Sequence, residues 1–510
     1  MTPTERHNLL TKDQDFLDRK GIAREKIEHQ LRHLRSGSHS VKLLAACTTG
    51  NGLQVLPQGE FELYRRTFRE ARLAGRVEKF VPASGAATRM FRSLNSAMLG
   101  EDDPAPLDEF CRNLLKFPFA GILREKLAEN GRDLDQLLVA GAFAEIVAFV
   151  LTGEGLGYNQ FPKGLLPFHQ YANGEVRTAF EEHLVEAAAY TRDVEGLARV
   201  HFTVAPQHRQ IIEAHIAEAV RKLSEPGLKY RIGYSSQNPA TDAVSLDSEE
   251  NPVRDEAGNL HLRPAGHGAL LENIVGLAGD IVFIKNIDNV VPDSLREPTI
   301  THKILLGGYL LTLQKKVFAY LAALDRGEPD EALIEEMAAF CAETLSRPLD
   351  RAFPEKSRDA QSDLLRAVLN RPLRVCGMVP NAGEPGGGPF WIEDRRGMRS
   401  IQIVESAQVD HLDPRQETIW NASTHFNPVD LVCGVRDYRG EPFDLDAFAD
   451  PEACFVTSKS MQGKKVTVFE LPGLWNGAMA GWNTVFVEVP AETFNPVKTV
   501  FDLLREGHKA

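Results

Sequence analysis

The segment from Lys79 to Phe91 has the residue types of a phosphate-binding turn. A short apolar run ends at Ala83, and Arg89 stands where a helix is expected to open. The residues between them are Ser84, Gly85, Ala86, Ala87 and Thr88. Small side chains let backbone N–H groups face an anion, and Arg89 could add a charge-assisted hydrogen bond. The segment predicts a nucleotide phosphate site, although a tight turn without a ligand also fits these residues.

Two further segments carry charged groups suited to phosphates. A glycine-rich loop from Thr152 to Gly164 presents one lysine, Lys163, which is either a phosphate contact or only a solvated side chain. Asp288 follows an apolar run that starts at Ile281. An aspartate at the carboxyl end of a parallel strand is well placed to hold Mg²⁺ together with substrate phosphates, but it can equally cap a turn.

A third segment, Gly266-His267-Gly268, closes a long polar stretch that begins at Ser235. Two glycines around a histidine permit close backbone approach to a flat ligand, and a helix after them would offer N–H groups. A turn before a helix is the other interpretation.

Strands and helices alternate in the part of the chain that carries these residues. Helical patterns at 180–190 and 207–223 are each followed by a strand pattern, at 198–204 and 230–234. This alternation predicts an α/β fold with a mixed, mostly parallel sheet covered by helices on both faces. Ligands of such sheets gather at the carboxyl ends of the strands.

The rest of the chain divides around this sheet. Residues 1–76 form an N-terminal helical segment, in which 46–52 has loop character, and the second part, 77–370, carries large helical insertions at about 93–157 and 295–369. Strands and glycine loops dominate the third part, 371–510. A chain of 510 residues is expected to divide in this way, because single cores seldom exceed about 250 to 300 residues.

Composition excludes several classes of protein. A net charge of -13 argues against nonspecific nucleic-acid binding, and 43% hydrophobic content is that of an ordinary globular protein. The N-terminus lacks the apolar core of a signal peptide, and the longest apolar run, 137–151, is too short for a membrane span. Six scattered cysteines without zinc spacing predict free thiols, a cytoplasmic location and no structural metal. The sequence leaves a homo-oligomer open.

A series of short motifs resembles, in the same order, those of the sugar-nucleotide pyrophosphorylases, especially the UDP-sugar and UDP-N-acetylhexosamine enzymes. Residues 85–90 are similar to their Gly-Thr-Arg-Leu loop, 162–164 to Pro-Lys-Gly, 264–268 to Pro-x-Gly-x-Gly and 287–289 to Val-Asp-Asn. Residues 404–406 resemble Val-Glu-Tyr-Ser, 421–426 an asparagine-rich strand leading to His-x-Phe, and 494–498 Phe-Ser-Pro-x-Lys. The chain also resembles a bacterial family known only as a domain of unknown function.

This resemblance implies a Rossmann-like nucleotidyltransferase core of the GT-A type. The implied reaction joins a nucleoside triphosphate and a sugar 1-phosphate into a nucleotide sugar and pyrophosphate, with Mg²⁺ as cofactor. The second part of the chain would bind the nucleotide and the third part the sugar phosphate. The implied residues are Arg89, Lys163 and Lys498 for catalysis, Ser84 to Thr88 and Gly266 to Gly268 for the nucleotide, Glu405 and Asn421 for the sugar, and Asp288 for the metal.

Other functions remain open at this point. The loop carries Ala86 and Ala87 where the resembled family has glycine, so a catalytically degenerate regulator that binds a nucleotide or a nucleotide sugar is the alternative. A glycosyltransferase is a weaker rival, because Lys163 and Lys498 both look suited to phosphates. A P-loop kinase is disfavoured, because the chain has no GxxxxGK[ST] motif.

Overall fold

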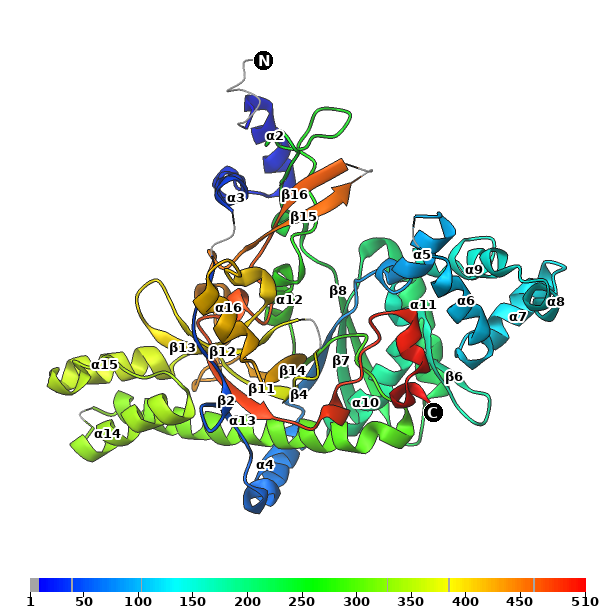
Figure 1. The fold of residues 1–510 in the computed structure, drawn as a ribbon. Coiled ribbons are helices and arrows are strands. Elements are labelled where there is room, and N and C mark those ends of the chain that lie inside the picture. Colours follow the sequence, from blue (N-terminus) through cyan, green and yellow to red (C-terminus); the bar gives the residue numbers. More distant parts are fainter. Residues whose placement is uncertain (1–8, 38–39, 102, 328, 384–385, 462–463) are drawn as a thin grey trace. The chain divides into compact units, whose positions relative to one another are not determined.

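A computed structural model of the chain describes residues 9–37, 40–101, 103–327, 329–383, 386–461 and 464–510. It is a mixed α/β protein with many helices and a large, mostly parallel sheet of nine strands (Figure 1). The strand order in this sheet is β2-β3-β17-β11-β14-β10-β4-β7-β8. The predicted α/β class with a mostly parallel sheet is therefore confirmed.

The chain forms two compact units. Unit 1 contains residues 1–68, 237–283 and 306–489, and unit 2 contains residues 69–236, 284–305 and 490–510. Three elements have residues in both units, namely α4 (Phe61–Leu73), β10 (Ile281–Lys285) and α13 (Arg296–Asp325).

Unit 2 is built on three parallel strands that end together. Pro82 at the end of β4 pairs with Thr203 of β7, which pairs with Ser235 of β8. Its strands are β4 (Val77–Pro82), β5 (Pro167–Gln170), β6 (Val176–Thr178), β7 (Leu197–Thr203) and β8 (Lys229–Ser235). Because the strands share a carboxyl edge, the residues that follow β4 lie at the position where α/β proteins bind ligands.

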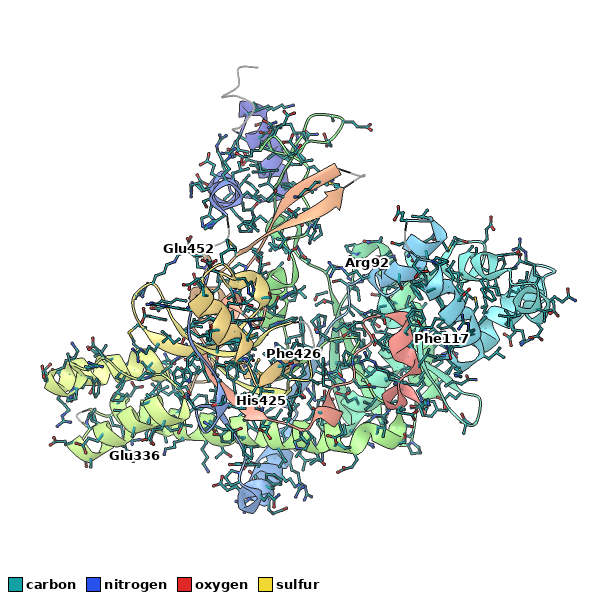
Figure 2. All side chains as sticks on the ribbon, viewed as in Figure 1. Arg92, Phe117, Glu336, His425, Phe426 and Glu452 are labelled. Carbon is teal, nitrogen blue, oxygen red and sulfur yellow. The ribbon has the colours of Figure 1, made fainter. Side chains whose placement is uncertain are left out.

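A capping box starts helix α10 of unit 2. Thr178 caps α10 by accepting from the N–H of Glu181, whose side chain accepts from the N–H of Thr178 in return. The unit's helices are α5 (Arg92–Met98), α6 (Ala105–Arg112), α7 (Ala120–Glu129), α8 (Leu134–Val139), α9 (Phe143–Leu151), α10 (Ala179–Thr191) and α11 (Arg209–Lys222). Helices α5 to α9 occupy most of the range expected for the first helical insertion, and the rings of Phe110, Phe117 and Phe119 stack in their core. Figure 2 labels Phe117.

Unit 1 combines several sheets with helices, two of which lie at its N-terminal end. Its helices are α2 (Thr11–Lys20), α3 (Arg24–Ser36), α12 (Leu271–Val275), α14 (Glu331–Ala339), α15 (Arg358–Leu369) and α16 (Pro414–Asn421). Its strands are β1 (Lys42–Ala46), β2 (Thr48–Thr49), β3 (Gly52–Gln54), β9 (Ser245–Leu246), β11 (Leu373–Pro380), β12 (Gly388–Glu393), β13 (Arg399–Val404), β14 (His425–Gly434), β15 (Phe455–Met461), β16 (Lys464–Glu470) and β17 (Asn483–Glu488). Besides its strands of the large sheet, unit 1 holds two three-stranded sheets, β1-β12-β13 and β15-β16-β9.

Two local expectations were wrong. Residues 46–52, expected to be a loop, contribute to three short strands, because β1 pairs with β12 and β3 pairs with β17, both distant in sequence. Asn421, expected on a strand, ends helix α16, and the strand β14 begins only at His425.

Two other properties of the chain follow from the same structure. All six cysteines are free, as predicted, and all six are buried. Within the described ranges, every helix is too short or too polar to cross a membrane.

Candidate functional site

The centre of the candidate site is Asp288, which lies just after β10 in unit 2. Its Oδ2 accepts hydrogen bonds from Nζ of Lys163 at 3.1 Å and from Nζ of Lys498 at 3.2 Å. The Asp288 side chain is only 11% exposed, whereas that of Lys498 is 54% exposed. Two ammonium groups thus converge on one carboxylate oxygen, and one of them also reaches solvent.

Lys163 reaches Asp288 because the helical insertion returns to the loop that it leaves. Ala86 and Pro162 form an antiparallel bridge, in which the N–H of Ala87 donates to the carbonyl of Phe161 and the N–H of Lys163 donates to the carbonyl of Gly85. The Pro-Lys-Gly segment therefore lies directly beside the small-residue loop, although the whole insertion separates them in the sequence.

Lys498 reaches Asp288 through a second pairing. Asn289 bridges to Pro496, and the N–H of Val497 donates to the carbonyl of Asp288. The carbonyl of Val497 in turn accepts from Nζ of Lys163 at 2.6 Å. Backbone pairing therefore places Lys498 beside the aspartate.

The loop after β4 presents only part of the predicted set of N–H donors. Ser84, Gly85 and Ala86 are exposed, and within the part of the chain that is described their N–H groups donate to no acceptor. The N–H of Ala87 is the exception, because it is buried and bonded to Phe161. Thr88 and Arg89 are exposed in the one-turn helix that follows, so their side chains are accessible to a ligand.

Electrostatics keep Asp288 ionised. Burial alone would raise the pKa of Asp288, but Lys163 and Lys498 outweigh it and hold the pKa below its ordinary value. Its Oδ1 is buried and has no hydrogen-bond donor among the described residues. An ionised oxygen with vacant lone pairs suits a hard cation such as Mg²⁺, which one or two carboxylates hold together with substrate phosphates.

A buried charge network that we did not predict includes Lys79 and Lys285, which lie a few residues before the phosphate loop and before Asp288. Glu186 of α10 forms ion pairs with Lys79 at 3.1 Å and Lys285 at 2.8 Å, and all three side chains are almost fully buried. Burial lowers the pKa of Lys79 to about 7. The available signal was a lysine in the mainly apolar strand β4 and a lysine at the end of the apolar strand β10.

The predicted base-binding residues lie in unit 1 and pack against the chain itself. The ring of His267 stacks on Trp475 with centroids 4.2 Å apart, and its Nδ1 accepts from the N–H of Leu474. A Cβ on Gly268 would lie 1.9 Å from the carbonyl oxygen of Pro472. The close approach that Gly266 and Gly268 were expected to offer a ligand is thus used by residues 470–475. Burial lowers the pKa of His267 to about 4, so the ring is neutral at physiological pH.

The two predicted sugar-binding residues have different surroundings. Oε1 of Glu405 accepts from Nε1 of Trp475 at 3.3 Å, and burial raises the pKa of Glu405. Asn421 lies in the wall of a cavity of about 310 Å³, where its amide donates to Glu417. Other residues of this wall are Asn381, Ser406, Trp420, Ser423, His425 and Phe426, of which Figure 2 labels the last two. Glu405 does not line this cavity, although Ser406 does.

Sequence reasoning missed Trp475, which contacts both His267 and Glu405. Trp475 is one of four tryptophans in the chain and follows the Pro-Gly pair at 472–473. Neither fact indicates which residues it contacts. The structure therefore brings together Lys163, Lys498, Asp288 and the loop in unit 2, and links His267 to Glu405 through Trp475 in unit 1.

Comparison with known proteins places the chain in a family. It belongs to the family described as "Domain of unknown function (DUF4301)", whose model matches residues 10–509, and this confirms that part of the predicted resemblance. No curated protein matches the sequence.

Solved structures similar to the chain include sugar-nucleotide pyrophosphorylases, the group that the motifs resemble. A UDP-N-acetylglucosamine pyrophosphorylase from Trypanosoma brucei is 12% identical, with 94% of this chain and 74% of that chain covered and a TM-score of 0.47. A UDP-glucose phosphorylase from Trypanosoma brucei is 14% identical, with 98% and 80% covered and a TM-score of 0.46. A UDP-glucose pyrophosphorylase variant from Leishmania major is 12% identical, with 98% and 79% covered and a TM-score of 0.44.

Proposed function

We propose that this chain is a Mg²⁺-dependent nucleotidyltransferase that makes a nucleotide sugar and pyrophosphate from a nucleoside triphosphate and a sugar 1-phosphate. The observation that carries the proposal is the convergence of Lys163 and Lys498 on Oδ2 of Asp288. Two cations beside a carboxylate with a second, unpaired oxygen form a set that suits phosphate groups together with a divalent cation.

The reaction needs charge neutralisation and positioning more than a covalent nucleophile. A phosphate oxygen of the sugar 1-phosphate attacks the α-phosphorus, a new P–O bond forms, and the bond to the bridging oxygen of pyrophosphate breaks. The leaving group carries the charge away, so no proton has to move for the exchange to balance.

Each lysine has donors to spare for this chemistry. Nζ of Lys163 donates to Asp288 and to the carbonyl of Val497, which leaves one of its N–H groups for an oxygen on the α-phosphate. Lys498 is more exposed and would hold the phosphate of the sugar. The N–H groups of Ser84 to Ala86, with Arg89, would hold the β- and γ-phosphates, and a helix opening after them favours negative charge.

Asp288 would hold Mg²⁺ through Oδ1, the oxygen that the lysines leave vacant. When bound, the metal ion offsets the negative charge of the phosphate oxygens. Lys163 and Lys498 meanwhile fix the carboxylate by its other oxygen, so that its orientation is set before any substrate binds.

A transfer assay tests this proposal directly. Nucleoside triphosphates labelled at the α-phosphate are incubated with pooled sugar 1-phosphates and Mg²⁺, then treated with phosphatase and separated by chromatography. We expect label in a phosphatase-resistant product that requires a sugar 1-phosphate. Label that stays in phosphatase-sensitive nucleotides with every triphosphate would refute the transfer reaction.

One observation favours a second function, that of a nucleotide-binding regulator. The N–H of Ala87 is already bonded to Phe161, so the loop has one donor fewer for a triphosphate. A regulator would be stabilised by a nucleotide in thermal unfolding yet form no labelled product. The proposed enzyme would be stabilised by the nucleotide and would also form the labelled product.

A further inference from the structure

Two histidines of helix α3 and a distant glutamate form a cluster in unit 1, apart from every residue used above. His29 and His33 are four positions apart, so both side chains leave the same face of the helix. Glu452, which Figure 2 labels, lies in the turn before β15. Its Oε1 contacts the rings of both histidines. The search for zinc spacing in the sequence did not find this group, because it contains no cysteine and its third member is more than four hundred residues away.

The three ligand atoms form a nearly equilateral triangle. Nε2 of His29 is 3.0 Å from Oε1 of Glu452 and 3.1 Å from Nε2 of His33, and Nε2 of His33 is 3.4 Å from the same glutamate oxygen. Zn²⁺ binds imidazole nitrogen and carboxylate oxygen at about 2.0 to 2.1 Å in a tetrahedron, whose ligand atoms are then about 3.3 Å apart. The triangle has the size of one face of such a tetrahedron.

Hydrogen bonds alone do not account for this triangle. Each ring nitrogen carries at most one hydrogen, and an ionised carboxylate carries none. Two hydrogens cannot occupy three edges, so at least one of the close contacts joins two atoms with no proton between them. A cation at the centre of the triangle would satisfy all three atoms at once.

The surroundings hold the ligands in this arrangement. Nη1 of Arg395 donates to Oε2 of Glu452 at 2.8 Å, which orients the carboxylate and leaves Oε1 for the cluster. The side chain of His33 is only 7% exposed, and its ring packs against that of Phe469 in β16. Helix α3 itself is fixed by Ile27, Leu31 and Leu34, which belong to a core shared with β9 and β16.

We propose that His29, His33 and Glu452 bind a divalent transition-metal ion, with Zn²⁺ as the best match to two imidazoles and one carboxylate. The fourth position would be taken by water, because the side chains of His29 and Glu452 are 31% and 30% exposed. The ion would link helix α3 to the turn before β15. Its role would be to hold helix α3 against the rest of unit 1. This ion is chemically distinct from the Mg²⁺ proposed at Asp288.

Calorimetric titration of the metal-free, untagged full chain with Zn²⁺, in excess Mg²⁺, tests this site. We expect one equivalent of Zn²⁺ to bind, and His29→Ala, His33→Ala and Glu452→Gln each to weaken binding by about ten-fold or more. His411→Ala is the matched control, because His411 and Glu417 form an exposed pair that no third His, Cys, Asp or Glu among the described residues joins.

Two further readouts make the test independent of activity and of folding defects. Co²⁺ in place of Zn²⁺ should give the strong visible absorption of a tetrahedral site in the wild type and in His411→Ala, but not in Glu452→Gln. Zn²⁺ should also raise the melting temperature of the wild type and not that of Glu452→Gln, whose circular dichroism serves as the folding check. Undiminished Zn²⁺ binding by all three cluster variants, or no binding by the wild type, would overturn the proposal.

Discussion

Nζ of Lys163 lies 3.1 Å from Oδ2 of Asp288, although 125 positions separate the two residues in the chain. Lys163 is placed by the return of the chain after the helical insertion, because Pro162 bridges to Ala86. A second bridge, between Asn289 and Pro496, places Lys498 beside the same aspartate. The first bridge fixes Lys163 through backbone hydrogen bonds, so its side chain can be removed without removing what positions it.

Replacement of Lys163 should therefore affect turnover far more than folding. We expect Lys163→Ala to lower kcat/KM for pyrophosphate release by about a hundred-fold or more, because a charged contact to the transition state is worth about 3 to 4 kcal/mol. The control is Lys126→Ala, which removes an exposed lysine paired with Glu129 in the same unit. Near-wild-type turnover in Lys163→Ala would exclude it from the site.

The carboxylate of Asp288 should make the unfolding free energy of the protein depend on pH in the acid range. Its pKa is below the ordinary value in the folded protein, so the stabilisation is present above about pH 4 and is lost as the pH falls through the folded pKa. We expect the difference in unfolding free energy between the wild type and Asp288→Asn to shrink as the pH is lowered below about 4. Urea unfolding at several pH values measures it, and a constant difference would contradict the ion-paired state.

Lys79 should make stability rise with pH as well, but in a higher pH range. Burial lowers its folded pKa to about 7, so above that pH the unfolded chain binds more protons and stability rises with pH. The expected slope is up to about 1.4 kcal/mol per pH unit between about pH 7 and pH 10. Lys79→Met leaves the pair of Glu186 with Lys285 and removes this slope.

Comparing the unfolding free energy of the wild type with that of Lys79→Met removes the contribution of the other titrating groups, which both proteins share. The stability of Lys79→Met relative to the wild type should fall as the pH rises over this range. A relative stability that does not change with pH would show that Lys79 keeps its proton in the folded protein.

Gly268 should tolerate no side chain, for a reason that lies within unit 1. A Cβ there would lie 1.9 Å from the carbonyl oxygen of Pro472, so Gly268→Ala must displace the segment that carries Trp475. We expect a loss of about 1 to 3 kcal/mol of stability, measured by chemical unfolding. Gly276→Ala is the matched control, because no atom lies within 4 Å of its added Cβ, and an equal effect in both variants would contradict the steric cause.

The sequence allowed prediction of those features that depend on local pattern. The alternation of α10, β7, α11 and β8 could be predicted, because each of these helices and strands shows its own spacing of apolar residues and has recognisable ends. Asp288 could be singled out because it follows an apolar strand, where α/β proteins place functional groups, and Lys163 because a glycine-rich loop presents it.

Features that depend on distant partners could not be predicted in the same way. Strands β2 and β3 are two and three residues long and exist only because β17 pairs with β3. The stacking of His267 on Trp475 joins segments that no local pattern connects. The N–H of Ala87 donates to the carbonyl of Phe161 and is therefore not available to a ligand. This could not be predicted, because the sequence does not show that the chain returns to the loop after the helical insertion.

The most direct test of the proposed reaction is pyrophosphate release by the wild-type protein in a matrix of nucleoside triphosphates against sugar 1-phosphates with Mg²⁺. We expect release in at least one combination, dependent on both substrates and greatly reduced in Lys163→Ala. No release in any combination of a broad matrix, from folded protein that a nucleotide still stabilises, would contradict the nucleotidyltransferase and leave a nucleotide-binding regulator.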